Sequence, residues 1–211
     1  MIEIKNVSIE TRHNILKDVN YIFEDGKIYG IVAINGSGKT TFFRTLVKLL
    51  HQSSGQIKFD MKSVDELRKN VFYYESQEWL DKNLSGMDYL HFVSSMWPSD
   101  KRIDSIVEYW SMEEYVKLPI KKYSLGMKQR LGIACALMEC PDLILLDEPI
   151  NAIDEKGVPK IWEALQEEKQ RGALIVLACH DTEELTSLAD QIITIEEGKI
   201  CGISSQIERN S

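Results

Sequence analysis

The chain has 211 residues, of which 44% are apolar and 27% are charged, and its formal net charge is −8. This ordinary globular composition and length allow a substantial core, so we expect one domain with a lobe or insertion. The acidic balance argues against a protein that binds nucleic-acid backbones, because that affinity comes largely from Lys and Arg neutralising phosphates. Any nucleotide site must therefore be built locally.

Cysteine spacing and apolar runs exclude other classes. The four cysteines are Cys135, Cys140, Cys179 and Cys201. No pair has the short spacing of a zinc site or a redox dithiol, so we interpret them as reduced core thiols. The first ten residues alternate apolar and polar side chains, which favours a strand over a signal peptide. The longest apolar stretches, at 131–138 and 173–179, fall well short of the roughly 20 residues that span a bilayer. If membranes matter here, a partner supplies the span.

The first part of the chain predicts three strands, at about 2–9, 19–23 and 27–33, followed by a glycine-rich turn. A helix is predicted at about 39–50, because apolar residues recur there at the spacing of a core-facing stripe. The residues of this stripe are Phe42, Phe43, Leu46, Leu49 and Leu50.

The remaining elements suggest a lobe inserted into a core. From 77 to 140 the pattern becomes helical, whereas 1–76 and 141–211 predict a core of strands and helices. The runs 143–146 and 173–179 are continuously apolar, which is typical of parallel strands covered on both faces. The helix between these runs carries Val158, Ile161 and Leu165 on one side, and Gly172 suits its C-terminus. A final strand pair is expected at 192–195 and 199–203.

The strongest chemical signal is the segment AINGSGKT at 33–40, which follows a predicted strand and opens a helix, as a phosphate-binding loop does. Glycines let backbone N–H groups turn toward phosphate oxygens, Lys39 would reach the β- and γ-phosphates, and Thr40 would offer its hydroxyl to Mg²⁺. Ala33 stands where the strict pattern has its first glycine. The predicted nucleotide-binding residues are Ala33, Ile34, Asn35, Gly36, Ser37, Gly38, Lys39, Thr40 and Thr41.

A second signal is the apolar run 143–146, which ends in Asp147 and Glu148. Burying adjacent acids without partners is costly, so a structural use for this pair is improbable. At a nucleotide site the two acids would have different roles. Asp147 would hold the Mg²⁺ shell, and Glu148 would orient or deprotonate the attacking water.

The segment YSLGMKQR at 123–130 resembles the signature motif of ATP-binding-cassette ATPases, in a variant with Leu125 where the usual form has glycine. It also reads as a helix N-terminus, with Ser124 and a glycine, suited to a phosphate group. The resemblance implies that this segment contacts the nucleotide held by a second protomer. The contacting residues implied are Ser124, Gly126, Lys128 and Gln129.

Further motifs of that family follow in order. The segment 151–154 resembles the loop that crosses the dimer interface, which implies that Asp154 belongs to the nucleotide site. His180 matches the switch histidine, whose imidazole contacts the γ-phosphate and braces the water-orienting glutamate. In the place of the family's glutamine loop, we predict Gln77 as a Mg²⁺ ligand, with Ser76 as the alternative.

Adenine recognition is less evident, because the family usually stacks the base on an aromatic residue in the early strand region. Thr11 stands at about that position here, and Arg12 or His13 could stack instead.

The resemblance covers nearly the whole chain and implies an α/β fold: a phosphate-loop NTPase core with a largely parallel mixed sheet, flanking helices and an N-terminal antiparallel part. It implies ATP and Mg²⁺ as ligands, and ATP hydrolysis at sites shared by a homodimer or by a heterodimer with a related subunit. A separate transmembrane permease would be the partner at the inner face of the cell membrane, and neither nucleic acid nor direct membrane insertion is expected.

The signature variant is similar to that of bacterial drug, peptide or bacteriocin-immunity exporters, so export is favoured. One alternative is an ATPase of the same family that acts on ribosomes or DNA, although such proteins usually carry tandem cassettes or long insertions. A phosphate-loop kinase is another, but it would need an acceptor site and has no use for the segment 123–130.

Overall fold

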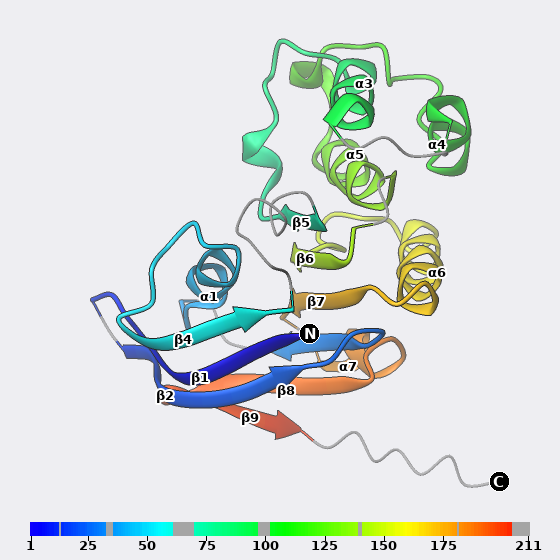
Figure 1. The fold of residues 1–211 in the computed structure, drawn as a ribbon. Helices are drawn as coiled ribbons and strands as arrows, with labels where there is room; N and C mark the ends of the chain where they lie inside the picture. The colour runs from blue at the N-terminus through cyan, green and yellow to red at the C-terminus, as the bar shows by residue number, and fades with distance from the viewer. Residues whose placement is uncertain are drawn as a thin grey trace, which may run out of the picture.

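The computed structural model describes residues 1–12, 14–32, 36–60, 70–96, 102–138, 141–180 and 182–203 (Figure 1). Of the predicted site residues, Ala33, Ile34 and Asn35 lie outside the described residues, as does His13. No helix in the described ranges is long and apolar enough to cross a bilayer.

Two sheets form the body of the molecule. A three-stranded antiparallel sheet has the order β2-β1-β4, with β1 Ile2–Glu10, β2 Asn14–Phe23 and β4 Ser54–Phe59. A six-stranded sheet has the order β5-β6-β7-β3-β8-β9 and is parallel except for its last pair. Its strands are β3 Ile28–Val32, β5 Val71–Tyr74, β6 Leu143–Asp147, β7 Leu174–Cys179, β8 Gln191–Glu196 and β9 Lys199–Ile203. The predicted mixed, largely parallel sheet with an N-terminal antiparallel part is therefore confirmed.

The central strands are buried on both faces, as their continuous apolar sequences predict. In β6, Ile144 and Leu146 join one hydrophobic cluster, whereas Leu143 and Leu145 join a second cluster on the other face. Successive side chains of a strand point to opposite faces, so one strand serves two cores. The second core lies against the antiparallel sheet, and the first lies against most of the helices.

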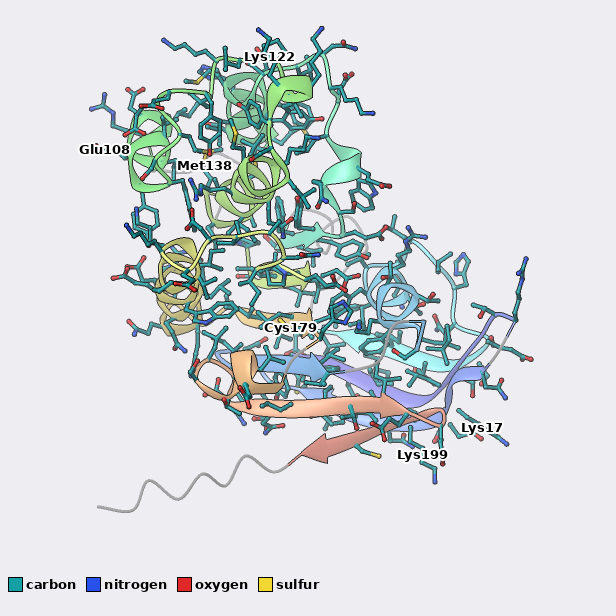
Figure 2. All side chains as sticks on the ribbon, turned by 180° about the vertical axis from the view of Figure 1, so that it is seen from behind. Lys17, Glu108, Lys122, Met138, Cys179 and Lys199 are labelled. Atoms are coloured by element: carbon teal, nitrogen blue, oxygen red, sulfur yellow. The ribbon has the colours of Figure 1, made fainter. Side chains whose placement is uncertain are left out.

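The helices surround the larger sheet. Their bounds are α1 Lys39–Leu46, α3 Gly86–Met96, α4 Ile103–Tyr109, α5 Leu125–Met138, α6 Gly157–Gln170 and α7 Thr182–Thr186, with short 3₁₀ turns η1 Gln77–Trp79 and η2 Ile120–Lys122. Figure 1 shows α3, α4 and α5 grouped beyond the β5–β6 edge of the sheet, with α1 and α6 beside the core. In Figure 2, Glu108 and Lys122 mark the outer side of this helical group, and Cys179 lies in the middle of the molecule.

The helix α1 ends earlier than predicted, so the assignment of its last two leucines to the core stripe was wrong. Leu49 is 60% exposed and Leu50 is 38% exposed. Lys48 has a φ of 61°, and the N–H groups of Leu49 and Leu50 both donate to the carbonyl of Arg44, at 2.8 and 3.1 Å. A left-handed residue with such a closing bond ends the helix, which then turns both leucines toward solvent.

Helix α6 has the predicted apolar side, because Ile161 and Leu165 are fully buried and Val158 is partly buried. Gly172 follows it with a φ of 99°, the left-handed conformation that commonly ends a helix. The predicted final strand pair is β8 and β9, which are antiparallel.

Candidate active site

The described part of the predicted phosphate loop begins at Gly36. Gly36 and Gly38 have φ angles of 80° and 98°, in the left-handed region that favours glycine. A Cβ added to Gly38 would lie 2.5 Å from Cγ2 of Ile15, so close packing also excludes a larger residue there. Both glycines therefore shape the turn that leads into α1, where the first backbone N–H groups of a helix have no partner within it.

Thr40 joins this helix to the tip of the adjacent strand β6. Its Oγ1 donates a hydrogen bond of 2.6 Å to Oδ2 of Asp147, the last residue of β6. Lys39, one residue earlier, is 6% exposed. The carbonyl of Thr41 accepts from Oγ1 of Thr45 within the helix, at 2.8 Å. The predicted hydroxyl and carboxylate thus meet, although they are 107 residues apart in the chain.

Asp147 is almost buried, with 8% of its surface exposed. Burial raises the pKa of its carboxyl group, since a charge is less stable away from water, and the hydrogen bond from Thr40 opposes this rise. The charges of Glu148 and Glu75 raise this pKa further, whereas Lys39 lowers it. An additional cation beside Asp147 would therefore favour its ionised form.

Glu148 follows directly and faces the end of β7, the neighbouring strand. Its Oε1 lies 2.6 Å from Nε2 of His180, and its Oε2 accepts from Nδ2 of Asn151 at 3.3 Å. The backbone of Glu148 has a φ of 52°, which is uncommon for a residue with a side chain, and its N–H donates to the carbonyl of Ala178 at 2.9 Å. The two predicted catalytic residues, Glu148 and His180, are in direct contact.

These carboxylates border a small open cavity of about 230 Å³. Its lining residues are Glu75, Ser76, Gln77, Gln129, Asp147, Glu148 and Asn151. Gln77 and its alternative Ser76 both line it, but the hydroxyl of Ser76 already accepts a hydrogen bond from the N–H of Glu78 at 3.1 Å. Both residues stay predictions, since a hydroxyl oxygen that accepts one hydrogen bond can still bind a ligand.

Glu75 is a cavity residue that the sequence analysis did not identify. Its carboxylate accepts from Nε of Arg44 at 2.6 Å, from Nη2 of the same side chain, and from the hydroxyl of Tyr73 at 2.7 Å. The guanidinium group of Arg44 holds the pKa of this carboxyl below its ordinary value. The available signal was an acid directly after the short strand β5, a strand that the analysis had not recognised.

Gln129 requires a correction, because its buried amide is bonded within its own chain, which disfavours the predicted direct contact with a nucleotide. It is 2% exposed, and its Nε2 donates to the carbonyls of Glu148 and Pro149, both at 2.9 Å. Its Oε1 accepts from the hydroxyl of Tyr74 at 3.3 Å. The side chain is therefore occupied within its own chain and faces the cavity from behind Glu148.

The other signature residues lie at the beginning of α5. Ser124 is exposed, and its Oγ accepts from the N–H of Met127 at 3.2 Å, which makes it the N-cap of the helix. Lys128 is half-buried one turn later. A Cβ on Gly126 would lie 2.5 Å from the carbonyl oxygen of Ala152, so the helix packs tightly against the segment 151–154.

Asp154 ends that segment and is held by its own chain. Its Oδ2 lies 3.1 Å from Nη2 of Arg130, on α5, and its Oδ1 accepts from the N–H of Gly157 at 2.7 Å. The side chain is 66% exposed, so it can also be reached from outside. These contacts tie the segment 151–154 to α5 and to the start of α6.

The oxygen atoms at this site suit Mg²⁺ as ligands. The hydroxyl of Thr40 and the carboxylate of Asp147 are neighbouring oxygen atoms, and the amide of Gln77 lines the same cavity. Mg²⁺ prefers oxygen ligands, and it is usually bound by one or two carboxylates together with substrate phosphates and water.

A glycine turn that opens a helix beside a parallel sheet, with acids at the end of another strand of that sheet, defines the phosphate-loop NTPase class. The family model described as "ABC transporter" matches residues 16–151. The ABC transporter ATP-binding protein YybJ of Bacillus subtilis, itself uncharacterised, is 35% identical over 210 residues, 95% of this chain and 94% of that protein. The lantibiotic transport ATP-binding protein SrtF of Streptococcus pyogenes is 37% identical over 204 residues, 95% of this chain and 89% of that protein.

Two solved structures share the fold. An ATP-binding subunit of an ABC transporter has a TM-score of 0.86 at 22% identity, covering 96% of this chain and 90% of the other. A dimeric ATP-binding cassette in a post-hydrolysis state, bound to ADP and Pi, has a TM-score of 0.81 at 24% identity, covering 95% and 96%. The chain belongs to the ABC transporter family. It is an ATP-binding and ATP-hydrolysing subunit of that family, and the resemblance to ATP-binding-cassette ATPases is confirmed.

Proposed function

We propose that this subunit drives export across a membrane by ATP-dependent closure of a dimer, together with a separate transmembrane permease. The observation that carries the proposal is that Thr40, at the start of α1, bonds to Asp147 at the end of β6, while Glu148, directly after β6, contacts His180, directly after β7. The first pair supplies oxygen atoms that can hold a metal ion beside the phosphates, and the second pair supplies a carboxylate that can orient water.

In this proposal, Lys39 and the N–H groups of the loop bind the β- and γ-phosphates of ATP. Mg²⁺, held by Thr40 and Asp147 and with Gln77 nearby, would neutralise charge on these phosphates. Glu148 accepts a proton from the attacking water, and His180 keeps its carboxylate oriented. The products are ADP and phosphate.

The nucleotide would lie between two protomers. Ser124, Gly126 and Lys128 are at the N-terminus of a 14-residue helix, where backbone N–H groups favour an anion. Ser124 is exposed, so it is available to the γ-phosphate bound by a second copy or by a related subunit. The neighbouring fold whose structure holds ADP and Pi is itself a dimer, which supports this arrangement.

Transport is favoured over action on ribosomes or DNA. One relative at 37% identity is named for lantibiotic transport, and the net charge of −8 disfavours a nucleic-acid partner. We infer a peripheral subunit on the cytoplasmic face of the membrane, coupled to a permease that carries a peptide-like substrate outward. Copurification with a multi-span membrane protein encoded beside it is the test of the partner.

The enzymatic core of the proposal is tested with Glu148→Gln, which keeps the shape of the side chain but removes its basicity. Turnover should fall by about 10²–10⁴-fold, the usual size of a general-base contribution, while ATP binding is retained. Because ATP favours the state that binds it better, the closed dimer should then accumulate with ATP and Mg²⁺. Sizing by light scattering measures this dimer.

Adding Ser124→Arg to Glu148→Gln should prevent the dimer, because a bulky cation would fill the space for the partner's γ-phosphate. Ser105→Arg is the matched control, since Ser105 is exposed on α4, and its dimer should persist. A Glu148→Gln protein that remains monomeric at high protein concentration, or a Ser124→Arg double variant that still dimerises, would contradict the shared site.

A further inference from the structure

The side chain of Gln129 connects two parts of the chain that the proposed function treats separately. It lies on α5, five residues after Ser124, and it is 2% exposed. Its amide group bonds to the carbonyls of Glu148 and Pro149 on one side and to the hydroxyl of Tyr74 on the other. Both amide hydrogens are used and the amide oxygen has a donor, so the orientation of the group is fixed.

Gln129 bonds to the backbone of Glu148, which has an uncommon conformation. Glu148 has a φ of 52°, a region that residues with a Cβ avoid unless the surroundings impose it. Its N–H is held by the carbonyl of Ala178, and its carbonyl accepts both from Gln129 and from the N–H of Asn151 at 3.2 Å. Among the hydrogen bonds of the described residues, those from Gln129 are the ones in which a side chain donates to the carbonyls of this turn. They restrict the motion of the turn's backbone.

The direction of a side chain follows from its backbone, because the Cα–Cβ bond turns with φ. A relaxed Glu148 backbone would swing the carboxylate away from Nε2 of His180, which lies only 2.6 Å from it. A misplacement of about 1 Å can cost a factor of about 100 in rate.

We propose that Gln129 is a positioning residue for Glu148: its amide holds the left-handed turn at 148–149 so that the carboxylate faces the attacking water. The proposal rests on the proposed role of Glu148 in hydrolysis. The amide of Gln129 is bonded to Glu148, Pro149 and Tyr74, so Gln129 acts through the backbone of Glu148.

The position of Gln129 also gives α5 a mechanical route to the hydrolytic site. A rise of about 1.5 Å per residue puts Gln129 about 7.5 Å along the helix axis from Ser124. In the proposed dimer, the beginning of α5 meets the nucleotide of the other protomer. A shift of α5 would then displace the two hydrogen bonds on the turn that carries the protomer's own Glu148.

The test is Gln129→Met, which keeps the length of the side chain but removes all three hydrogen bonds. Single-turnover hydrolysis at saturating ATP should slow by about 10- to 100-fold, with ATP affinity within about twofold of the unmodified protein. Ile133→Val, a conservative change at a fully buried position one turn later on α5, is the matched control and should keep the rate within about twofold.

The same substitution made in a Glu148→Gln protein distinguishes a positioning role of Gln129 from a general destabilisation of the core. In a Glu148→Gln protein, Gln129→Met should slow the remaining hydrolysis by less than about twofold, because the residue that it positions is already inactive. If the two losses multiply, or if Gln129→Met alone keeps its full rate, the positioning role is refuted. If Glu148→Gln itself keeps full turnover, the proposed function fails and the cause lies there.

Should Gln129→Met not fold, Tyr74→Phe replaces it. This change removes only the hydroxyl that fixes the amide orientation, and it should slow single-turnover hydrolysis by about threefold or more without altering ATP affinity. An unchanged rate in folded Tyr74→Phe would overturn the proposal.

Discussion

Nε2 of His180 lies 2.6 Å from Oε1 of Glu148, although 32 residues separate them in the chain. The contact arises because β6 and β7 are adjacent and parallel, so the residues that follow them emerge at the same edge of the sheet. Glu148 is less exposed than His180, at 29% against 47%.

This contact predicts that His180→Ala slows hydrolysis by about 10- to 100-fold, because Glu148 loses a partner that orients it. Single-turnover hydrolysis at saturating ATP measures the effect without a contribution from binding. His91→Ala is the control, since His91 is exposed on α3, and it should leave the rate unchanged. A His180→Ala protein with the full rate would mean that the contact does not orient Glu148.

The pair of Arg44 and Glu75 predicts an asymmetry in stability. The Glu75 side chain is 9% exposed, whereas that of Arg44 is 42% exposed. Arg44→Met strands a nearly buried carboxylate and should lower the free energy of unfolding by about 1–3 kcal/mol. Glu75→Gln should lower the free energy of unfolding by less, because the guanidinium group of Arg44 stays in contact with water.

Urea unfolding of the two single variants and the double variant measures this asymmetry. The double variant should be less destabilised than the sum of the single changes, because the stranded charge is then absent. Additive losses would show that the two side chains do not stabilise each other.

Gly126 predicts a packing defect on enlargement. Gly126→Ala would bring a Cβ to 2.5 Å from the carbonyl oxygen of Ala152, and backbone atoms there have to move. Overpacking of this kind costs about 1–3 kcal/mol, and each kcal/mol lowers the thermal midpoint of a chain of this size by roughly 2–4 °C. Gly202→Ala is the matched control, because no atom lies within 4 Å of the added Cβ, and its midpoint should not fall.

The start of α3 predicts a dependence of stability on pH. Oδ2 of Asp88 accepts from the hydroxyl of Ser85 at 2.6 Å and from its N–H at 2.8 Å, and these bonds lower the pKa of Asp88. A carboxyl group whose pKa is lower in the folded state stabilises the fold above its unfolded pKa, about 3.9, and this contribution disappears as pH falls through the folded value.

Asp88→Asn therefore provides the comparison. The unmodified protein should be more stable than Asp88→Asn at pH 7, and the difference should shrink steadily as the pH falls below about 3.9. Urea midpoints between pH 7 and pH 3 measure it. A difference that stays constant over this range would exclude ionisation of Asp88 as its source.

Sequence patterns predicted the strands that are buried on both faces, because a continuous apolar run such as Leu143–Leu146 is typical of a strand covered on both sides. The strand Ser54–Phe59 escaped prediction because only Ile57 in it is buried and its other residues are mostly polar. The strand Val71–Tyr74 is only four residues long, and as a result the importance of Glu75 at its end was also missed.

The motifs predicted that Thr40, Asp147 and Glu148 belong to one nucleotide site, and the family resemblance implied that His180 joins them. They could not predict the role of Gln129. A motif marks which residues recur around a ligand, whereas burial and the left-handed turn at Glu148 are properties of the folded chain. The orientation of the Gln129 side chain determines whether it contacts the ligand or supports the backbone at 148–149, and the sequence does not show that orientation.

The sharing of strands between two hydrophobic clusters bears on how the molecule can be divided. The apolar face of the helical segment 77–140 is completed by alternate residues of β6 and β7, such as Ile144 and Leu177. Their neighbours Leu143 and Val176 fill the core on the other side of the same strands. An excised 77–140 fragment would lose the surface against which it folds, and the remainder would lose the cover of its central sheet. The two parts should therefore melt in one cooperative transition, and neither should persist as a folded fragment after proteolysis between them.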